Sequence, residues 1–272
     1  MEKEELGKAV DSMETGIGDE YDDFLDDIDD GVDIADLPPA KYTGPVDFKF
    51  VKDPAKRDEL LAARASVGIV LHRFAKDKLM QAMTADDWGA AAKRMDFTPE
   101  DILEGGLARN VFCRDFTVLL EDRNGGPVIR RVMKDPDSLS ERDRAAAAYY
   151  ENYRFTWLEV LAAKAGIGMK CRDLLNGEDL FLAELGYSRG DVKGSTICVG
   201  IAPMGAVYFS YSTLIRARFT EGRDAALQSI LAKLGLPEKT PGNLSFPDQA
   251  RFAAETFRLL ADSRDSDLIH YY

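Results

Sequence analysis

The chain has 272 residues and is 45% hydrophobic, so it can bury the core of one large domain or two smaller ones. No stretch approaches the roughly 18 apolar residues of a membrane helix, and the acidic N-terminus lacks the apolar centre of a secretion signal. We therefore expect a cytoplasmic protein without a membrane segment. Three cysteines in apolar surroundings, Cys113, Cys171 and Cys198, predict buried free thiols.

The negative charge is concentrated in residues 1–40. They hold 15 Asp and Glu against two Lys, a net of −13 that equals the net charge of the whole chain. Residues 41–272 therefore balance at 33 acidic (48 − 15) and 33 basic (35 − 2) side chains, which excludes a general basic footprint for nucleic acid but leaves room for a local patch.

Dense like charge predicts that residues 1–40 form an acidic disordered tail. Aromatic residues such as Tyr21 and Phe24 stand among its Asp residues. This mixture suits a solubilising tail, a segment that recognises a partner, or an internal mask over the folded body. A calcium loop is excluded, because Ile28 occupies a position where an oxygen ligand is needed.

Residues 41–151 predict a mainly helical region. After Asp53, apolar residues recur every three to four positions, and Pro54 suits the first turn of a helix. The apolar positions are Leu60, Ala63, Val67, Val70, Leu71, Phe74, Met80 and Met83.

Three further helix starts are predicted in this region. Thr84, Thr98 and Ser140 are each followed three residues later by Asp, the pattern of a capped N-terminus. Residues 111–120 indicate an amphipathic helix, although their β-branched and aromatic residues leave a strand as the alternative.

Residues 152–272 predict a small curled antiparallel β-sheet or barrel followed by C-terminal helices, so the expected fold class is α+β. Five strand-like segments separated by turns lie within 153–213. Asn176-Gly177 predicts a two-residue hairpin turn that pairs Cys171 with Leu182. The hairpin places Met169, Cys171, Leu175, Leu180 and Leu182 on an apolar face, and Lys170, Arg172 and Asp179 on a polar face.

The end of the chain predicts two helices and a docked tail. Helices are expected over 225–234, stopped by Gly235, and over 247–261, capped by Ser245. Residues 268–272 are apolar enough to dock on the body.

Several motifs in residues 111–208 resemble a known group of proteins. They are Phe112–Phe116, Asp122–Gly125, Leu139–Asp143, Leu158–Val160, Gly166–Gly168, Arg172–Glu178, Ser188-Arg189 and Gly194. In this order they resemble uncharacterised bacterial proteins that often carry a C-terminal SEC-C zinc motif. The zinc motif itself is absent, because no cysteine follows Cys198 and His270 alone cannot supply four ligands. The resemblance therefore implies neither a metal nor an activity.

Gly186–Gly190 matches the G-x-S-x-G string of α/β-hydrolases, with Ser188 as the nucleophile. Asp262 or Asp265 and then His270 follow in the order of a hydrolase triad. However, the residues after this string predict another strand, whereas a nucleophile elbow needs a helix there, so an ordinary turn is the favoured interpretation. No other catalytic or phosphate-binding pattern stands out, and we predict no catalytic residue, metal site or cofactor.

Arg172 and Asp173 form the most informative charged pair. Asp173 falls on the apolar face, where its carboxylate needs hydrogen bonds from turn amides or from an arginine, and a structural role competes with a binding role. Aromatic residues on the strands, including Trp157 and Tyr208, belong either to a binding face or to the core.

We predict a non-enzymatic binding or adaptor protein whose acidic tail recognises a protein partner or masks the body. The candidate binding residues are Arg172, Asp173, Trp157, Tyr208, Tyr21 and Phe24. Nucleic-acid binding restrained by the tail is the main alternative, and a hydrolase is a further one.

Overall fold

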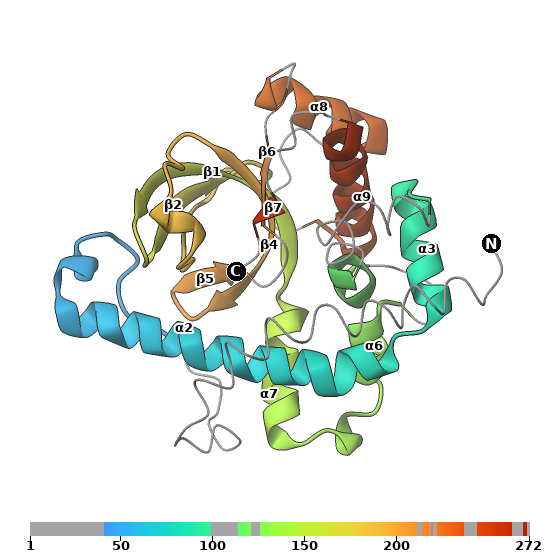
Figure 1. The fold of residues 1–272 in the computed structure, drawn as a ribbon, viewed down its shortest axis with the longest axis horizontal. Coiled ribbons are helices and arrows are strands. Elements are labelled where there is room, and N and C mark those ends of the chain that lie inside the picture. The colour runs from blue at the N-terminus through green and yellow to red at the C-terminus, as the bar shows by residue number, and fades with distance from the viewer. Residues whose placement is uncertain are drawn as a thin grey trace.

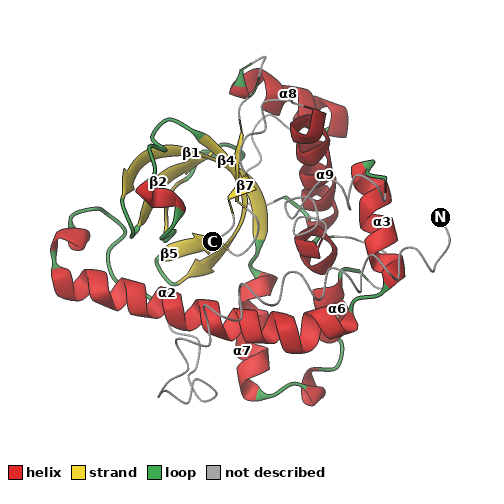
Figure 2. Ribbon diagram, viewed as in Figure 1, coloured by secondary structure: helices red, strands yellow, loops and turns green. Residues whose placement is uncertain are grey.

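A β-barrel lies beside a group of helices, and the long helix α2 (Pro54–Phe74) runs along the base of both (Figure 1). The computed structural model describes residues 41–98, 114–120, 126–210, 214–217, 219, 222–236, 244–262 and 269–270. Helices precede and follow the strands (Figure 2), so the predicted α+β class is confirmed. The tail predicted over residues 1–40 lies outside the described residues.

The N-terminal helix forms where the apolar period predicts it. The Asp53 side chain accepts a hydrogen bond from the amide of Ala55, and Pro54 occupies the first turn. The buried side of α2 consists of Leu60, Ala63, Val67, Val70, Leu71 and Phe74, all of them predicted. The helix continues into a π-helical stretch, η3 (Ala75–Met80).

Capping boxes start two of the predicted helices. Thr84 opens α3 (Ala85–Met95) and Ser140 opens α7 (Glu141–Glu151). Residues 114–119 are helical, which decides between the helix and the strand considered for that segment. The helix predicted after Thr98 falls outside the described residues. The remaining helical elements are η2 (Phe50–Lys52), α6 (Val128–Val132), η4 (Pro136–Ser138), η5 (Tyr187–Arg189), α8 (Arg223–Leu234) and α9 (Phe246–Asp262).

Five strands close into a barrel in the order β1-β2-β3-β5-β4, with β4 returning to β1. The strands are β1 (Arg154–Lys164), β2 (Gly168–Asp173), β3 (Asp179–Leu182), β4 (Thr196–Met204) and β5 (Val207–Ser210), and β6 (Leu214–Ala217) and β7 (Ile269–His270) extend the sheet from β4. The spatial order β4-β1-β2-β3 is a Greek key. The predicted barrel is confirmed, and the parallel β3–β5 pair makes its sheet mixed.

The hairpin between β2 and β3 differs from its prediction. Cys171 pairs with Leu180 instead of Leu182, so residues 174–177 form a four-residue loop and the predicted two-residue turn is wrong. The wider loop is held by the carboxylate of Asp173, which accepts hydrogen bonds from the amides of Leu175 and Asn176. Because the register moves by two residues, the side chains that lie in β2 and β3 keep their predicted faces. Leu175 does not: it lies in the loop and packs in the cluster outside the barrel.

The barrel wall separates two apolar clusters. One fills the interior and includes Leu158 and Val160 of β1, while Phe155 and Trp157 of the same strand belong to the cluster between the barrel and the helices. This alternation is the ordinary period of a strand. Cluster members from α2, α7, α8 and α9 cover the outward aromatic residues, and the helices thereby close one side of the barrel.

The C-terminal elements follow their sequence signals. α8 ends at Gly235, which adopts a left-handed conformation, and the hydroxyl of Ser245 accepts a hydrogen bond from the amide of Asp248 at the start of α9. β7 pairs with β6 through Ile269 opposite Ile215, so the described part of the predicted docking segment, residues 269–270, joins the sheet.

Candidate binding face on the barrel

The inner face of β2 ends in a buried charge cluster. The Asp173 side chain is 1% exposed, and its Oδ1 accepts a hydrogen bond from the hydroxyl of Thr156 at 2.8 Å. Its Oδ2 lies 3.2 Å from the guanidinium of Arg154, whose side chain is 9% exposed. Burial raises the pKa of Asp173, while Arg154 and the hydrogen bonds oppose that shift. With the amides of Leu175 and Asn176, these contacts give Asp173 the donors that the sequence predicted, and they support its structural role.

The outer face of β2 carries charges that stay in water. Arg172 Nε lies 2.9 Å from Oδ1 of Asp179, and Lys170 Nζ lies 3.3 Å from Oδ2 of the same residue. The side chains of Lys170 and Arg172 are 48% and 49% exposed. The hydrogen bond from Arg172 holds the pKa of Asp179 below its ordinary value. Arg172 and Asp173 therefore belong to opposite sides of the wall and form no common site.

The segment that follows the acidic residues is fixed to the barrel, and we call it the strap (residues 42–52). Tyr42 is 1% exposed, and its carbonyl accepts a hydrogen bond from the amide of Ala206 at 2.9 Å. It bridges to Gly205, where a Cβ atom would lie 2.1 Å from the Tyr42 oxygen and where φ is +64°, so glycine is required.

Aromatic contacts hold the other end of the strap. The rings of Phe48 and Phe50 have their centroids 5.6 and 5.8 Å from that of Phe181 on the outer face of β3. Phe181 in turn leans over Gly168 of β2, where an added Cβ would meet its ring at 2.8 Å. The strap is thereby a part of the barrel's outer wall.

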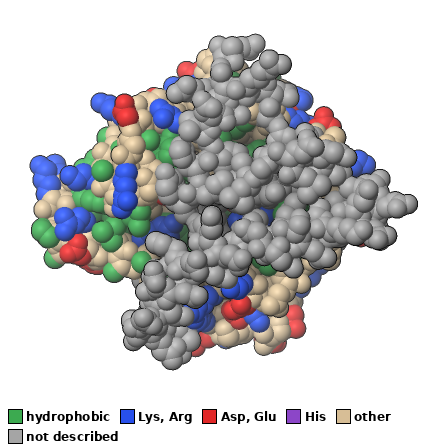
Figure 3. All heavy atoms as spheres, viewed as in Figure 1, with side chains coloured by type: hydrophobic (Ala, Val, Ile, Leu, Met, Phe, Trp, Pro, Cys, Tyr) green, Lys and Arg blue, Asp and Glu red, His purple; other side chains and the backbone are tan. Residues whose placement is uncertain are grey.

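Exposed cations gather around this wall. Lys49 and Lys52 of the strap, Lys164 of β1, and Lys170 and Arg172 of β2 are all exposed, and we call these five side chains the basic face. Lys164 is opposite Gly168, and Lys170 is opposite Phe181, which places the strand residues side by side with the strap. Figure 3 shows Lys and Arg side chains on the side of the molecule formed by the barrel and the start of α2.

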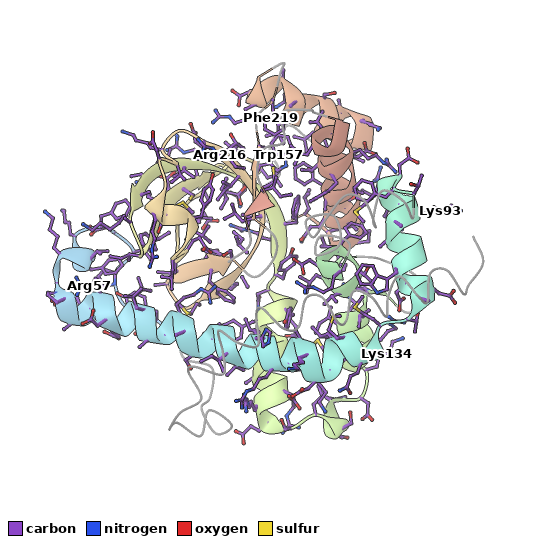
Figure 4. The ribbon with its side chains drawn as sticks, viewed as in Figure 1. Arg57, Lys93, Lys134, Trp157, Arg216 and Phe219 are labelled. Atoms are coloured by element: carbon purple, nitrogen blue, oxygen red, sulfur yellow. The ribbon has the colours of Figure 1, made fainter. Side chains whose placement is uncertain are left out.

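The predicted aromatic binding residues lie elsewhere. Trp157 is fully buried; its Nε1 donates to the hydroxyl of Thr256 at 3.0 Å, and its ring stacks on Phe219 with centroids 4.5 Å apart (Figure 4). Tyr208 is half-buried beneath Arg154, whose guanidinium carbon is 5.0 Å from the ring centroid. Trp157 is therefore part of the apolar cluster between the barrel and the helices, and Tyr208 packs against the interior cluster. Tyr21 and Phe24 are outside the described residues.

The G-x-S-x-G string forms a turn. Ser188 is 2% exposed within η5, and its hydroxyl donates to the carbonyl of Leu185 at 3.2 Å and accepts from the amide of Gly166 at 3.1 Å. The string leads through a loop into β4 instead of a helix. These contacts match the turn interpretation and give Ser188 a structural role.

The described thiols are buried. Cys171 and Cys198 are free and buried, as predicted, and burial raises the pKa of both thiols; Cys113 is outside the described residues. Within the described part of the chain, no cluster of three or more His, Cys, Asp or Glu side chains is arranged to hold a metal ion. Nor does any helix described there combine the length and apolarity needed to cross a bilayer.

Comparison with known proteins identifies no relative. The chain matches no family model, no curated protein and no solved structure. The resemblance to the SEC-C-associated bacterial proteins therefore stays a prediction from the sequence.

The sequence did not reveal the strap or the partner of Asp173. The strap contacts Phe181 and Gly205, more than a hundred residues further along the chain, and only the alternating aromatic residues Phe48 and Phe50 signalled an apolar face. Arg154 could have been inferred, because it shares its strand parity with Thr156 and thus faces the barrel interior.

Proposed function

We propose that this protein is a non-enzymatic binding or adaptor protein in which the barrel is a rigid scaffold. Its acidic residues 1–40 would recognise a protein partner or mask the scaffold's own surface. The observation that carries the proposal is the strap, because it attaches the acidic segment at a fixed point, Tyr42, next to the basic face. A recognition segment and a mask both benefit from such an attachment, since it defines what lies within reach of the acids.

The roles of the charged and nucleophilic side chains support a binding function. Ser188 bonds to the backbone on both sides, and Asp173 is engaged by Arg154 and by turn amides. The side chains of the basic face are exposed to solvent, and two of them, Lys170 and Arg172, pair with the exposed Asp179.

An affinity capture from bacterial lysate tests this proposal. The bait is the full-length chain, compared with an acid-neutral variant in which all 15 Asp and Glu of residues 1–40 are replaced by Asn and Gln. Partners lost in the variant would identify a recognition segment, and partners gained would identify a mask. The same partners in the same amounts from both baits would contradict the proposal, provided that both show the same urea unfolding midpoint.

Nucleic-acid binding is a second candidate, favoured by the position of the basic face. Small five-stranded Greek-key barrels such as OB-folds bind oligonucleotides on the outer face of strands 2 and 3, and Lys170 and Arg172 stand on β2 here. The acid-neutral variant should then bind a fluorescein-labelled oligothymidylate at least tenfold more tightly than the full-length chain, with an affinity that falls as salt rises. No change in fluorescence anisotropy with either protein would exclude this candidate.

A further inference from the structure

We infer that residues 1–40 bind the basic face of their own barrel, as an intramolecular polyanion. This inference rests on the proposed function and narrows it to self-masking by a named segment on a named surface. The contacts lie within one chain. An external polyanion would therefore bind Lys170 and Arg172 only after it displaces the acidic segment.

The wall of the barrel that carries the basic face is accessible. The outward residues of β1 near its start, such as Phe155 and Trp157, are buried under helices. Further along the same sheet, Lys164, Lys170 and Arg172 are exposed. The barrel therefore has a covered wall beside α9 and an open, charged wall around β2.

The charges of the basic face and of residues 1–40 are opposite in sign. The five cations of the basic face outnumber the exposed carboxylates beside them, Asp47, Asp53, Glu178 and Asp179, which leaves a net charge of +1 (5 − 4). The neighbouring Glu159 is engaged by Arg223 at 2.9 Å. The acidic segment brings a net charge of −13, far more than this face needs for neutralisation.

Only a short stretch of chain, the tether, joins the acidic residues to the strap. Asp36 precedes Tyr42 by six residues, a distance that an extended chain can span to about 20 Å. The strap residue Lys49 follows Tyr42 by only seven residues, and its neighbours Phe48 and Phe50 are packed on the barrel. A short tether raises the effective concentration of a binding segment to roughly millimolar, so weak ion pairs suffice. At physiological salt, such pairs act over about 8 Å, which requires the acids to lie on the face itself.

Carbodiimide cross-linking of the full-length monomer, read by mass spectrometry, tests the inference directly. We expect cross-links from acids within residues 1–40 to Lys49, Lys52, Lys164 and Lys170, suppressed at high salt. Lys93 of α3 and Lys134 after α6 serve as internal controls, because both are exposed and lie on the helical side of the molecule (Figure 4). Equal cross-linking to the controls, or cross-links found only in dimers, would overturn the inference.

A pair of matched variants adds a second readout. Lys170→Glu with Arg172→Glu reverses the strand part of the basic face, while Lys93→Glu with Lys134→Glu makes the same change in net charge on the helical side. We expect cross-linking to Lys49, Lys52 and Lys164 to fall at least fivefold in the first variant and to stay within twofold in the second. Equal falls in both would show that overall charge, not the basic face, controls the contact.

The failure of this inference can be told apart from failure of the proposed function. If no cross-links reach the basic face but the acid-neutral variant still loses partners in the lysate capture, the segment recognises a partner and does not mask the barrel. If both experiments show no effect, the proposed function fails as well.

Discussion

The two faces of β2 carry the same kinds of charged side chain in opposite environments. On the inner face, Asp173 is 1% exposed and is held by Arg154, Thr156 and two turn amides. On the outer face, Arg172 is 49% exposed and shares Asp179 with Lys170. Arg172 and Asp173 are adjacent in sequence, so only the alternation of the strand separates them. The barrel wall thus divides charges that are buried and hold the fold from charges that stay exposed to solvent.

Desolvation explains the difference between the two faces. A buried carboxylate loses its water, and removal of its partners leaves an uncompensated charge in a medium of low dielectric. An exposed ion pair is screened and exchanges its contacts with water at little cost. The inner cluster must therefore be complete for the barrel to be stable, whereas the outer pairs can be rearranged at little cost.

The largest effect is expected from Asp173→Ala. The substitution leaves the buried guanidinium of Arg154 without its carboxylate and removes the acceptor for the four-residue loop, so we expect the free energy of unfolding to fall by about 3–5 kcal/mol. Urea denaturation followed by circular dichroism measures this loss. Asp179→Ala on the outer face is the control and should leave most of the stability intact; equal losses in the two variants would break the comparison.

Asp87 provides an intermediate case. Its side chain is 6% exposed, completes the capping box of α3 with Thr84, and lies 2.7 Å from the guanidinium of Arg131, which is itself 30% exposed. We expect Asp87→Asn to cost about 1–3 kcal/mol at neutral pH, because a cap and a charged hydrogen bond are both weakened. The measurement is again urea unfolding, with Asp86→Asn on the exposed side of the same turn as the control.

The pH dependence of this loss sharpens the comparison. Burial alone would raise the pKa of Asp87, but its hydrogen bonds with Arg131 and Thr84 outweigh burial and hold that pKa below the ordinary 3.8. A depressed pKa stabilises the fold above the unfolded value, and this contribution is lost as pH falls through the folded pKa. The stability difference between the wild type and Asp87→Asn should therefore shrink below pH 4. A difference that grows on acidification would contradict this account.

The smallest effect is expected from Arg172→Ala. Its side chain is exposed, and Lys170 still pairs with Asp179 after the substitution, so the urea midpoint should not change within error. The basic face nevertheless loses one cation, and cross-links to the acidic segment should decrease. A marked loss of stability would show that the outer pairs, like the inner cluster, are part of what holds the barrel together.

Local signals in the sequence predicted most elements of the fold. The apolar period of α2 and the capping residues Thr84 and Ser140 act within one or two turns of helix, and they place these helices correctly. The hairpin shows where local rules stop. Asn-Gly favours a two-residue turn, but the side chain of Asp173 bonds to the loop amides and selects a longer one.

The candidate site was less predictable, because its parts come from distant segments. Arg172 and Asp173 were singled out together, yet the barrel gives them unrelated roles. The sequence allows Trp157 a place on a binding face, but its side chain packs against α9. There its indole N–H donates a hydrogen bond to the hydroxyl of Thr256. The strap is not predictable from local sequence, because the residues that anchor it, Phe181 and Gly205, are more than a hundred positions away.

The sequence by itself determined the balance of charge, the starts of α2, α3 and α7, the five strands and the faces of the side chains that lie in them. These properties depend on composition, on periods of 3.6 and 2.0 residues, and on caps, all of which are local. Only the tertiary structure decided that β3 pairs in parallel with β5, that Arg154 pairs with Asp173, and that Tyr42 of the strap is fixed to Gly205. Those features depend on which distant surfaces exclude water from one another when the barrel closes, and no local pattern encodes that choice.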